Sequence, residues 1–186
     1  MRRTAIILST LLLTVPGATP AYQSKDDGGK YLLLATTKTS TMEKELNEAA
    51  DRGFRILSGS PTAGTEMAIF LQRVASPPNT YKYKLLATSR TGTMQKELNE
   101  AAAGGYRLMP STMISKKSMM GGVEIVAVME LSPSSGKRYD YRLLATSKTG
   151  TLQKEALEAQ EAGYVLVGMV SRGEHMVIME KETAGR

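Results

Sequence analysis

Three short turns, each rich in threonine and each carrying one basic residue, are the stretches of this sequence most suited to chemistry. They read TTKTST at 36–41, TSRTGT at 88–93 and TSKTGT at 146–151. Each turn precedes a segment with helical periodicity, so its backbone N–H groups would lie at a helix N-terminus, where anions bind. Hydroxyls and a cation beside such N–H groups predict an anion-binding site. The candidate residues are Lys38, Thr39, Arg90, Thr91, Lys148 and Thr149.

The same turns have a second interpretation, in which they only cap the helices that follow. Ser, Thr and Gly are favoured at the N-cap, and Glu or Gln three residues later completes a capping box. The N-cap residues would be Ser40, Gly92 and Gly150, with Glu43, Gln95 and Gln153 as their partners. Both interpretations stay open at this point, because a basic side chain in such a turn is readily solvated.

Three glutamates at aligned positions form a secondary candidate site. Glu66, Glu124 and Glu174 each stand at the start of the last apolar run of a repeated segment. Three converging carboxylates could bind a hard cation through oxygen ligands. The alternative is that each is a solvated charge where a strand begins. Apart from these metal candidates, the sequence predicts no metal and no cofactor.

Residues on which many enzymes depend are few in this chain. It has no cysteine and one histidine, His175, which follows Glu174 in the turn SRGEHM. No partner stands at a spacing typical of acyl-transfer chemistry with this histidine. The motifs GxGxxG, HExxH and GxSxG and the phosphate-binding loop are absent from the sequence. The sequence therefore predicts a protein that is not an enzyme.

The turns recur because the whole segment around them recurs. Residues 31–57, 83–109 and 141–167 match without a gap when they are aligned from their first tyrosines. Each copy reads as an apolar strand, the turn, a helix, a glycine followed by an aromatic residue, a second strand, a hairpin and a third strand. The predicted fold class is α+β, with three tandem βαββ repeats, mainly antiparallel sheets and one helix in each repeat.

The helix of the first copy is predicted over residues 41–52. Met42, Leu46 and Ala49 lie at helical spacing and form one apolar stripe. Gly53 follows, and glycine suits the left-handed residue that ends many helices. The helix should therefore cover a sheet with this stripe and then turn sharply into the second strand.

The third strands predict how the copies pack. EIVAVMEL at 124–131 and HMVIMEK at 175–181 are apolar at successive positions, which is typical of a strand covered on both faces. A helix can cover one face, so the other face must cover something else. One unit of this size also buries too little surface to be comfortably stable alone. We expect the three sheets to pack together with the helices on the outside, and a pseudo-threefold arrangement is our hypothesis.

Changes in composition divide the chain into segments. The first 21 residues read as a secretory signal peptide, because Arg2 and Arg3 precede an apolar run that is too short to span a membrane, and small residues follow up to Ala21. The other segments are a flexible lead-in at 22–30, repeats at 31–74, 83–131 and 141–182, and Pro/Ser-containing linkers at 75–82 and 132–140. We therefore expect an exported protein, periplasmic or extracellular, that does not span a membrane.

The charge of the chain bears on its partners. The formal net charge is +6, and loss of Arg2 and Arg3 with the signal peptide would lower it to +4. Basic residues are mixed with acidic ones rather than grouped, so we expect no nucleic-acid partner. The predicted partner is another protein or an anionic polymer of the cell envelope. The chain itself is expected to be a monomeric pseudo-trimer or part of a higher oligomer.

The segments YKLLAT, KELNEAAAGGYRLM and VIMEK also carry a resemblance. The chain resembles three tandem copies of a family of short bacterial modules of unknown function. The resemblance implies a compact βαββ fold and supplies no activity, cofactor or catalytic residue. The first copy departs from the pattern by ending in FLQR, and the third has Ala156 and Leu157 where the pattern has Leu-Asn.

Two functions remain open from the sequence. The first is an exported, non-catalytic structural or interaction module whose basic surface or exposed strand edges contact a partner. The second is a small-ligand or anion-binding protein that uses the three Thr/Lys turns.

Overall fold

The computed structural model describes residues 29–74, 80–132 and 136–183. The predicted signal peptide, residues 22–28 of the predicted lead-in and residues 75–79 and 133–135 of the predicted linkers lie outside the described residues. The described chain forms three units with the order strand, helix, strand, strand. The predicted α+β fold with three βαββ repeats is confirmed.

The three units have the same elements. The first has β1 (Tyr31–Thr36), α1 (Thr39–Asp51), β2 (Phe54–Pro61) and β3 (Met67–Arg73). The second has β4 (Lys82–Thr88), α2 (Thr91–Ala103), β5 (Arg107–Lys117) and β6 (Val123–Leu131). The third has β7 (Arg138–Thr146), α3 (Thr149–Glu161), β8 (Val165–Ser171) and β9 (His175–Thr183). None of the described helices is long and apolar enough to cross a membrane.

In each unit the third strand lies in the middle of a three-stranded antiparallel sheet. The strand orders are β1-β3-β2, β4-β6-β5 and β7-β9-β8. The first strand is therefore an edge strand, and its outer side presents backbone N–H and C=O groups that the sheet does not use. In the second and third units, side chains of the preceding unit bind this edge.

A glycine in the left-handed conformation turns the chain from each helix into the second strand. Gly53, Gly105 and Gly163 have φ values of +85°, +91° and +88°. After α2, the N–H of Gly105 donates to the carbonyl of Ala102 and the N–H of Tyr106 donates to that of Ala101. This is the Schellman pattern, in which the glycine avoids the strain that a Cβ would cause. The role predicted for these glycines is confirmed.

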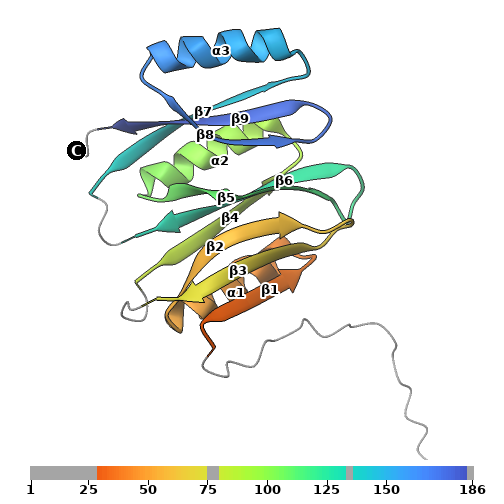
Figure 1. Cartoon of the computed structure of the whole chain (residues 1–186), viewed down its shortest axis with the longest axis vertical. Coiled ribbons are helices and arrows are strands. Elements are labelled where there is room, and N and C mark those ends of the chain that lie inside the picture. Colours follow the sequence, from red (N-terminus) through yellow and green to blue (C-terminus); the bar gives the residue numbers. More distant parts are fainter. Residues whose placement is uncertain (1–28, 75–79, 133–135, 184–186) are drawn as a thin grey trace, which may run out of the picture.

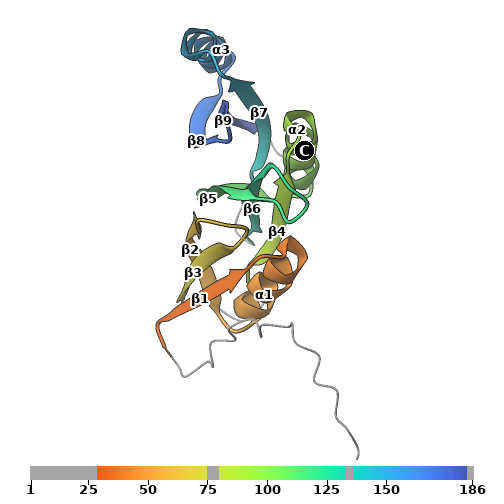
Figure 2. The same cartoon turned by 90° about the vertical axis from the view of Figure 1, so that its right-hand side faces the viewer.

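The units follow one another in a row along the long axis (Figures 1 and 2). Contacts join the first unit to the second through α1 with β4 and β2 with β5, and the second to the third through α2 with β7 and β5 with β8. The hypothesis of a pseudo-threefold arrangement does not describe this row. Each junction joins the helix side of one unit to the strand edge of the next, and such pairing forms a ring only when the rotation between units brings the last back to the first.

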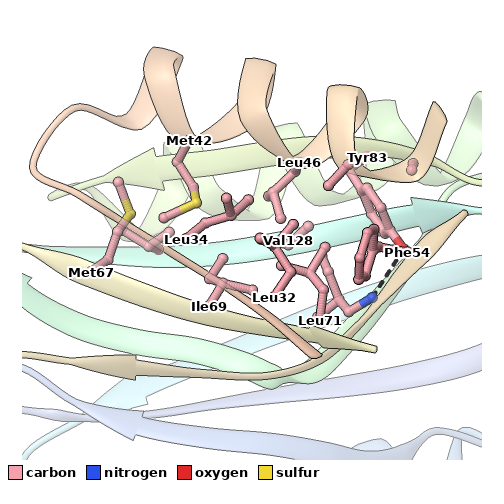
Figure 3. Packing of buried hydrophobic residues seen from close by; sticks show 14 of the residues in the cluster. Leu32, Leu34, Met42, Leu46, Phe54, Met67, Ile69, Leu71, Tyr83 and Val128 are labelled. Atoms are coloured by element: carbon pink, nitrogen blue, oxygen red, sulfur yellow. Dashed lines mark hydrogen bonds between the residues drawn. The ribbon is translucent and has the colours of Figure 1, made fainter. Parts of the chain in front are cut away.

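Two of the three hydrophobic cores are shared between neighbouring units. The core under α1 contains Tyr83, Val126 and Val128 of the second unit (Figure 3). The core under α2 contains Tyr141 and Ile178 of the third unit in the same way. The core under α3 is built from the third unit alone. α1 and α2 are thus covered by two units each, whereas α3 packs on its own sheet.

The central strand β6 shows why its sequence is apolar at successive positions. Ile125 and Met129 belong to the core under α2, whereas Val126 and Val128 belong to the core under α1. One face of the strand covers its own helix and the other covers the preceding unit. The prediction that the second face must cover something else is confirmed.

Candidate functional site

The strand-to-helix turns have the same local geometry in all three units. The N-cap residues are Lys38, Arg90 and Lys148, each with extended backbone angles. In the first unit the N–H of Lys38 donates to the Thr36 hydroxyl at 3.3 Å, and the carbonyl of Lys38 accepts the first helical hydrogen bond, from Met42, at 3.0 Å. Equivalent bonds occur at Arg90 and Lys148. The first threonine of each motif therefore holds the turn in shape.

The predicted capping box is wrong. The helices begin at Thr39, Thr91 and Thr149, so Ser40, Gly92 and Gly150 lie inside the first helical turn, and no N-cap side chain accepts a hydrogen bond. A lysine or arginine at the N-cap carries no acceptor, which explains the absence of a cap. Two of the side chains expected at the third helical position bind the next unit instead: Glu43 accepts a hydrogen bond from the backbone of Leu85 at 2.8 Å, and Gln95 accepts one from the backbone of Leu143 at 2.6 Å.

The structure does not bring the three turns together. They lie in successive units of the row, and Lys38, Arg90 and Lys148 are exposed. Two turns are contacted by the hairpin of the next unit, because Lys116 donates to the carbonyl of Thr37 at 3.4 Å and Arg172 donates to that of Ser89. A cation of the next unit thus contacts the carbonyl of Thr37 in the first turn and that of Ser89 in the second. The aligned residue of the third turn is Ser147, and no unit follows it in the described chain.

A groove of about 500 Å³ lies beside the second turn. Thr91, Gly92 and Gln95 line it from α2, and Glu155 lines it from α3. A carboxylate in the wall of this groove disfavours an anion. The six candidate anion-binding residues therefore form three separate, solvent-facing positions and not one shared site.

The three candidate metal-binding glutamates also lie in different units. Glu124 pairs with Lys116 at 2.5 Å across the β5–β6 hairpin, and Glu174 pairs with Arg172 at 3.0 Å. Glu66 accepts hydrogen bonds from Thr62 through its backbone carbonyl. No group of three His, Cys, Asp or Glu side chains in the described part of the chain could hold a metal ion. The hypothesis that these glutamates converge is wrong, since each contacts a residue of the hairpin in its own unit.

His175 begins β9, opposite Ser171 of β8, and its Nδ1 lies 3.2 Å from the Ser171 hydroxyl. The pair closes the turn of the β8–β9 hairpin. Within the described residues, no carboxylate hydrogen-bonds the other ring nitrogen, so the orienting group of an acyl-transfer site is absent.

A set of residues that sequence reasoning missed joins each unit to the next. Tyr83 of β4 enters the space between α1 and β2, where only 3% of the residue is exposed (Figure 3). Its hydroxyl accepts a hydrogen bond from the backbone N–H of Ile56 at 3.2 Å and donates one to Glu130 at 3.2 Å. Tyr141 of β7 repeats these bonds with Leu108 and Glu180, both at 2.8 Å.

Each of these tyrosines lies beside an ion pair that crosses the junction. Arg55 of the first unit donates two hydrogen bonds to Glu130 of the second, at 2.7 and 2.9 Å. Arg107 binds Glu180 of the third unit in the same bidentate manner, through Nη2 to Oε1 at 2.7 Å and Nε to Oε2 at 3.1 Å. Both glutamate side chains are buried, and both arginines are partly exposed. Two-point pairing fixes the orientation of the units as well as their distance.

The junction shifts the titration of these groups. The hydrogen bond to Glu130 raises the pKa of Arg55, and the hydrogen bond to Glu180 does the same for Arg107. Burial raises the pKa of Tyr83 and of Tyr141 well above the usual range for tyrosine, and the adjacent carboxylates act in the same direction. The tyrosines therefore stay protonated and available as donors.

The helices also bind the outer edge of the next unit's first strand. Asn47 of α1 accepts from the N–H of Tyr83 and donates to its carbonyl, both at 2.9 Å. Asn99 of α2 forms the same pair with Tyr141, and Gln95 adds bonds to Tyr141 and Leu143 at 2.6 Å each. Side-chain amides thus occupy the N–H and C=O groups that an edge strand leaves unpaired.

In the third unit the space that corresponds to the one between α1 and β2, which Tyr83 enters, is uncovered. We call this space, of about 340 Å³ between α3 and β8, the end groove; its lining includes Gln153, Ala156, Leu157, Val165, Leu166 and Met179. Leu166 is 57% exposed, whereas Ile56 and Leu108 at the aligned positions are 4% and 3% exposed. The difference arises because no following unit covers the end groove.

The sequence holds a signal for these junctions, in the columns of the repeat alignment. Tyr31, Tyr83 and Tyr141 begin the three copies, and the later two are the inserted tyrosines. Position by position, Asn47 and Asn99 align with Leu157, and Arg55 and Arg107 align with Val165. The two polar positions that change in the third copy are those that bind a following unit.

Comparison with known proteins adds no assignment. No family model, no curated protein and no solved structure matches this chain. The resemblance to short bacterial modules stays a prediction that rests on the sequence motifs.

Proposed function

We propose that this chain is an exported, non-catalytic structural or interaction module that binds another protein through its end groove. The observation that carries the proposal is the exposure of Leu166 in a groove whose two counterparts are filled by the next unit. A groove that is filled twice within the chain and empty at its end suits a protein ligand with an edge strand and an aromatic side chain.

Two exposed apolar residues, one in α3 and one in β8, support binding over simple termination of the row. Terminal units of repeat proteins usually carry a polar outer face that keeps them soluble. Here Leu157 and Val165 are 53% and 60% exposed at positions where the first two units have Asn and Arg. The end of the row is thus less polar at these two positions than the surfaces that are buried inside it.

A photo-crosslinking residue at position 166 tests this proposal in cells that export the chain. We expect covalent adducts with protein at position 166 and none with the same residue at Lys154, which lies on α3 with its side chain 79% exposed. Equal labelling from the two positions would contradict the proposal. The mass of the exported chain tests the export part, since cleavage after Ala21 gives a chain that begins at Tyr22.

Anion binding at the strand-to-helix turns is the second candidate function. It is favoured by one observation: three helix N-termini carry a basic N-cap residue and no side-chain cap. Such N–H groups interact favourably with phosphate or sulfate. Titration with inorganic phosphate tests it, because the triple variant Lys38→Ala, Arg90→Ala, Lys148→Ala should lose a thermal shift that the parent chain shows. An unchanged shift would refute this function.

A further inference from the structure

We propose that the end groove binds the first strand of a second copy of this chain, so that copies associate head to tail. The proposal rests on the proposed function, because it names the protein that the end groove takes. It extends to a third position the junction that the chain already forms twice.

The first unit supplies the part that the end groove lacks. Tyr31 aligns with Tyr83 and Tyr141, and it is 55% exposed, whereas they are 3% and 2% exposed. It lies in β1, an edge strand. The inserted tyrosine of each internal junction therefore has an uncovered counterpart at the start of the row.

The second face of the first sheet is uncovered in the same way. Phe70 of β3 aligns with Val128 and Ile178, which pack under the helix of the preceding unit. Phe70 is 50% exposed. Tyr31 and Phe70 thus form an apolar head on β1 and β3, and the end groove forms an apolar tail between α3 and β8. Figure 1 shows β1 and α3 at opposite ends of the row.

Both positions of the internal ion pair are neutral at the two ends of the row. Inside the row, Arg55 pairs with Glu130 and Arg107 pairs with Glu180. At the ends the arginine position holds Val165 and the glutamate position, opposite Tyr31 in the sheet, holds Gln72. Docking would bury an unpaired charge if only one of the two had changed, which is costly. Because both are neutral, head and tail can meet without an unpaired charge.

Polar groups for the edge strand are also retained. Gln153 occupies in α3 the position of Gln95, whose amide binds the carbonyl of Tyr141 and the N–H of Leu143. The corresponding backbone groups of a second copy belong to Tyr31 and Leu33. At the internal junctions the backbone N–H of Ile56 or Leu108 donates to the tyrosine hydroxyl. The aligned residue in the third unit is Leu166, whose backbone N–H would donate to Tyr31 of a second copy. One bidentate amide and one hydroxyl bond therefore remain available at the new junction.

The geometry decides between a second copy and the chain's own first strand. β1 and α3 lie at opposite ends of the row, so one chain cannot fill its own end groove (Figures 1 and 2). A contact between two different surfaces is heterologous, and it produces open chains or rings instead of closed twofold dimers. An open series of copies keeps one free head and one free tail, and a ring keeps none.

Sedimentation velocity of the purified exported chain over a wide concentration range tests the proposal. We expect species larger than a dimer at high concentration. Leu166→Asp removes the tail and Tyr31→Asp removes the head, and each variant alone should be monomeric. A mixture of the two should give a one-to-one dimer and nothing larger, because one intact tail then meets one intact head. Lys154→Asp on the exposed side of α3 is the matched control and should associate as the parent does.

A charge exchange separates specific docking from general apolar association. Val165→Arg alone and Gln72→Glu alone should each weaken association about tenfold or more, because each buries an unpaired charge. The double variant recreates the internal ion pair and should restore association to the parental level or above. Equal melting temperatures of the dilute variants show that each remains folded.

The outcomes distinguish this inference from the proposed function. A chain that stays monomeric at every concentration, or a dimer that Leu166→Asp does not disrupt, overturns head-to-tail association. If position 166 then still crosslinks to another protein in cells, the end groove binds a different partner and the proposed function stands. If it crosslinks to none, both fail.

Discussion

Helices α2 and α3 occupy the same place in their units, yet one is held between two units and the other packs on one. α2 buries Met94, Leu98, Ala101 and Ala102, whereas α3 buries only Leu152 and Ala159. The core under α2 draws on the third unit, and the core under α3 contains six buried residues, all from its own unit. The difference shows that much of the hydrophobic core under α1 and under α2 belongs to a junction between units, as in other repeat proteins.

The largest expected effect is the loss of a side chain in the core that the second and third units share. Leu98→Ala should destabilise the chain by about 2–5 kcal/mol, because Leu98 is fully buried and its removal leaves a cavity. Ala156 occupies the aligned position in α3. Ala156→Leu should therefore cost little or nothing. Denaturant unfolding measures both changes, and a similar cost at 98 and 156 would show that the two helices are not differently packed.

Breaking the ion pair at a junction should have the next effect. Arg107→Ala leaves the buried carboxylate of Glu180 with only the Tyr141 hydroxyl, so we expect a loss of about 2–4 kcal/mol. Arg142→Ala is the control, since Arg142 is an exposed residue of β7. A loss below 1 kcal/mol for Arg107→Ala, from denaturant unfolding, would mean that water solvates the carboxylate after truncation.

Removal of the amide that binds the edge strand should cost less. Asn99→Leu leaves the N–H of Tyr141 without its partner, and we expect about 1–3 kcal/mol of destabilisation. The carbonyl of Tyr141 keeps its bond from Gln95. Leu157→Asn is the reciprocal change in α3 and should alter stability by less than about 0.5 kcal/mol. The comparison fails if both changes have the same effect in dilute solution.

The smallest effect is a dependence of stability on alkaline pH. The folded chain raises the pKa of Tyr83 and Tyr141, so both remain protonated after tyrosines of the unfolded chain ionise near pH 10. Their contribution is complete below about pH 10 and is lost as pH rises above it, by up to about 1.4 kcal/mol per pH unit for each tyrosine. Unfolding at several pH values should show a shallower fall for Tyr141→Phe. Tyr31→Phe, at the exposed aligned position, is the control.

The repeat, the helix stripe and the final glycines could be predicted from the sequence because each depends on residues close in the chain. Met42 and Leu46 recur at helical spacing, and Gly53 marks a backbone conformation that other residues avoid. The start of the helix was predicted two residues late, since a lysine at the N-cap gives no local signal. Local rules thus identified the elements and missed one boundary in each unit.

The arrangement of the units could not be predicted in the same way. Tyr83 and Glu130 carry the junction, but a tyrosine at the start of a strand and a glutamate near the end of another have no recognisable spacing. Their meaning depends on strand order, which places them side by side on β4 and β6. The candidate turns, by contrast, were conspicuous because they repeat, and the repetition reflects a backbone shape that every unit needs.

The middle unit has one further consequence, which concerns how such a chain could lengthen. It alone carries both halves of the polar junction: Tyr83 and Glu130 face the unit before it, and Asn99 and Arg107 face the unit after it. A tandem duplication of residues 83–140 would therefore place a matching surface on each side of the new copy without any compensating substitution. Growth of the gene by this segment would preserve folding, while duplication of either outer unit would bring a neutral side chain against a charged one.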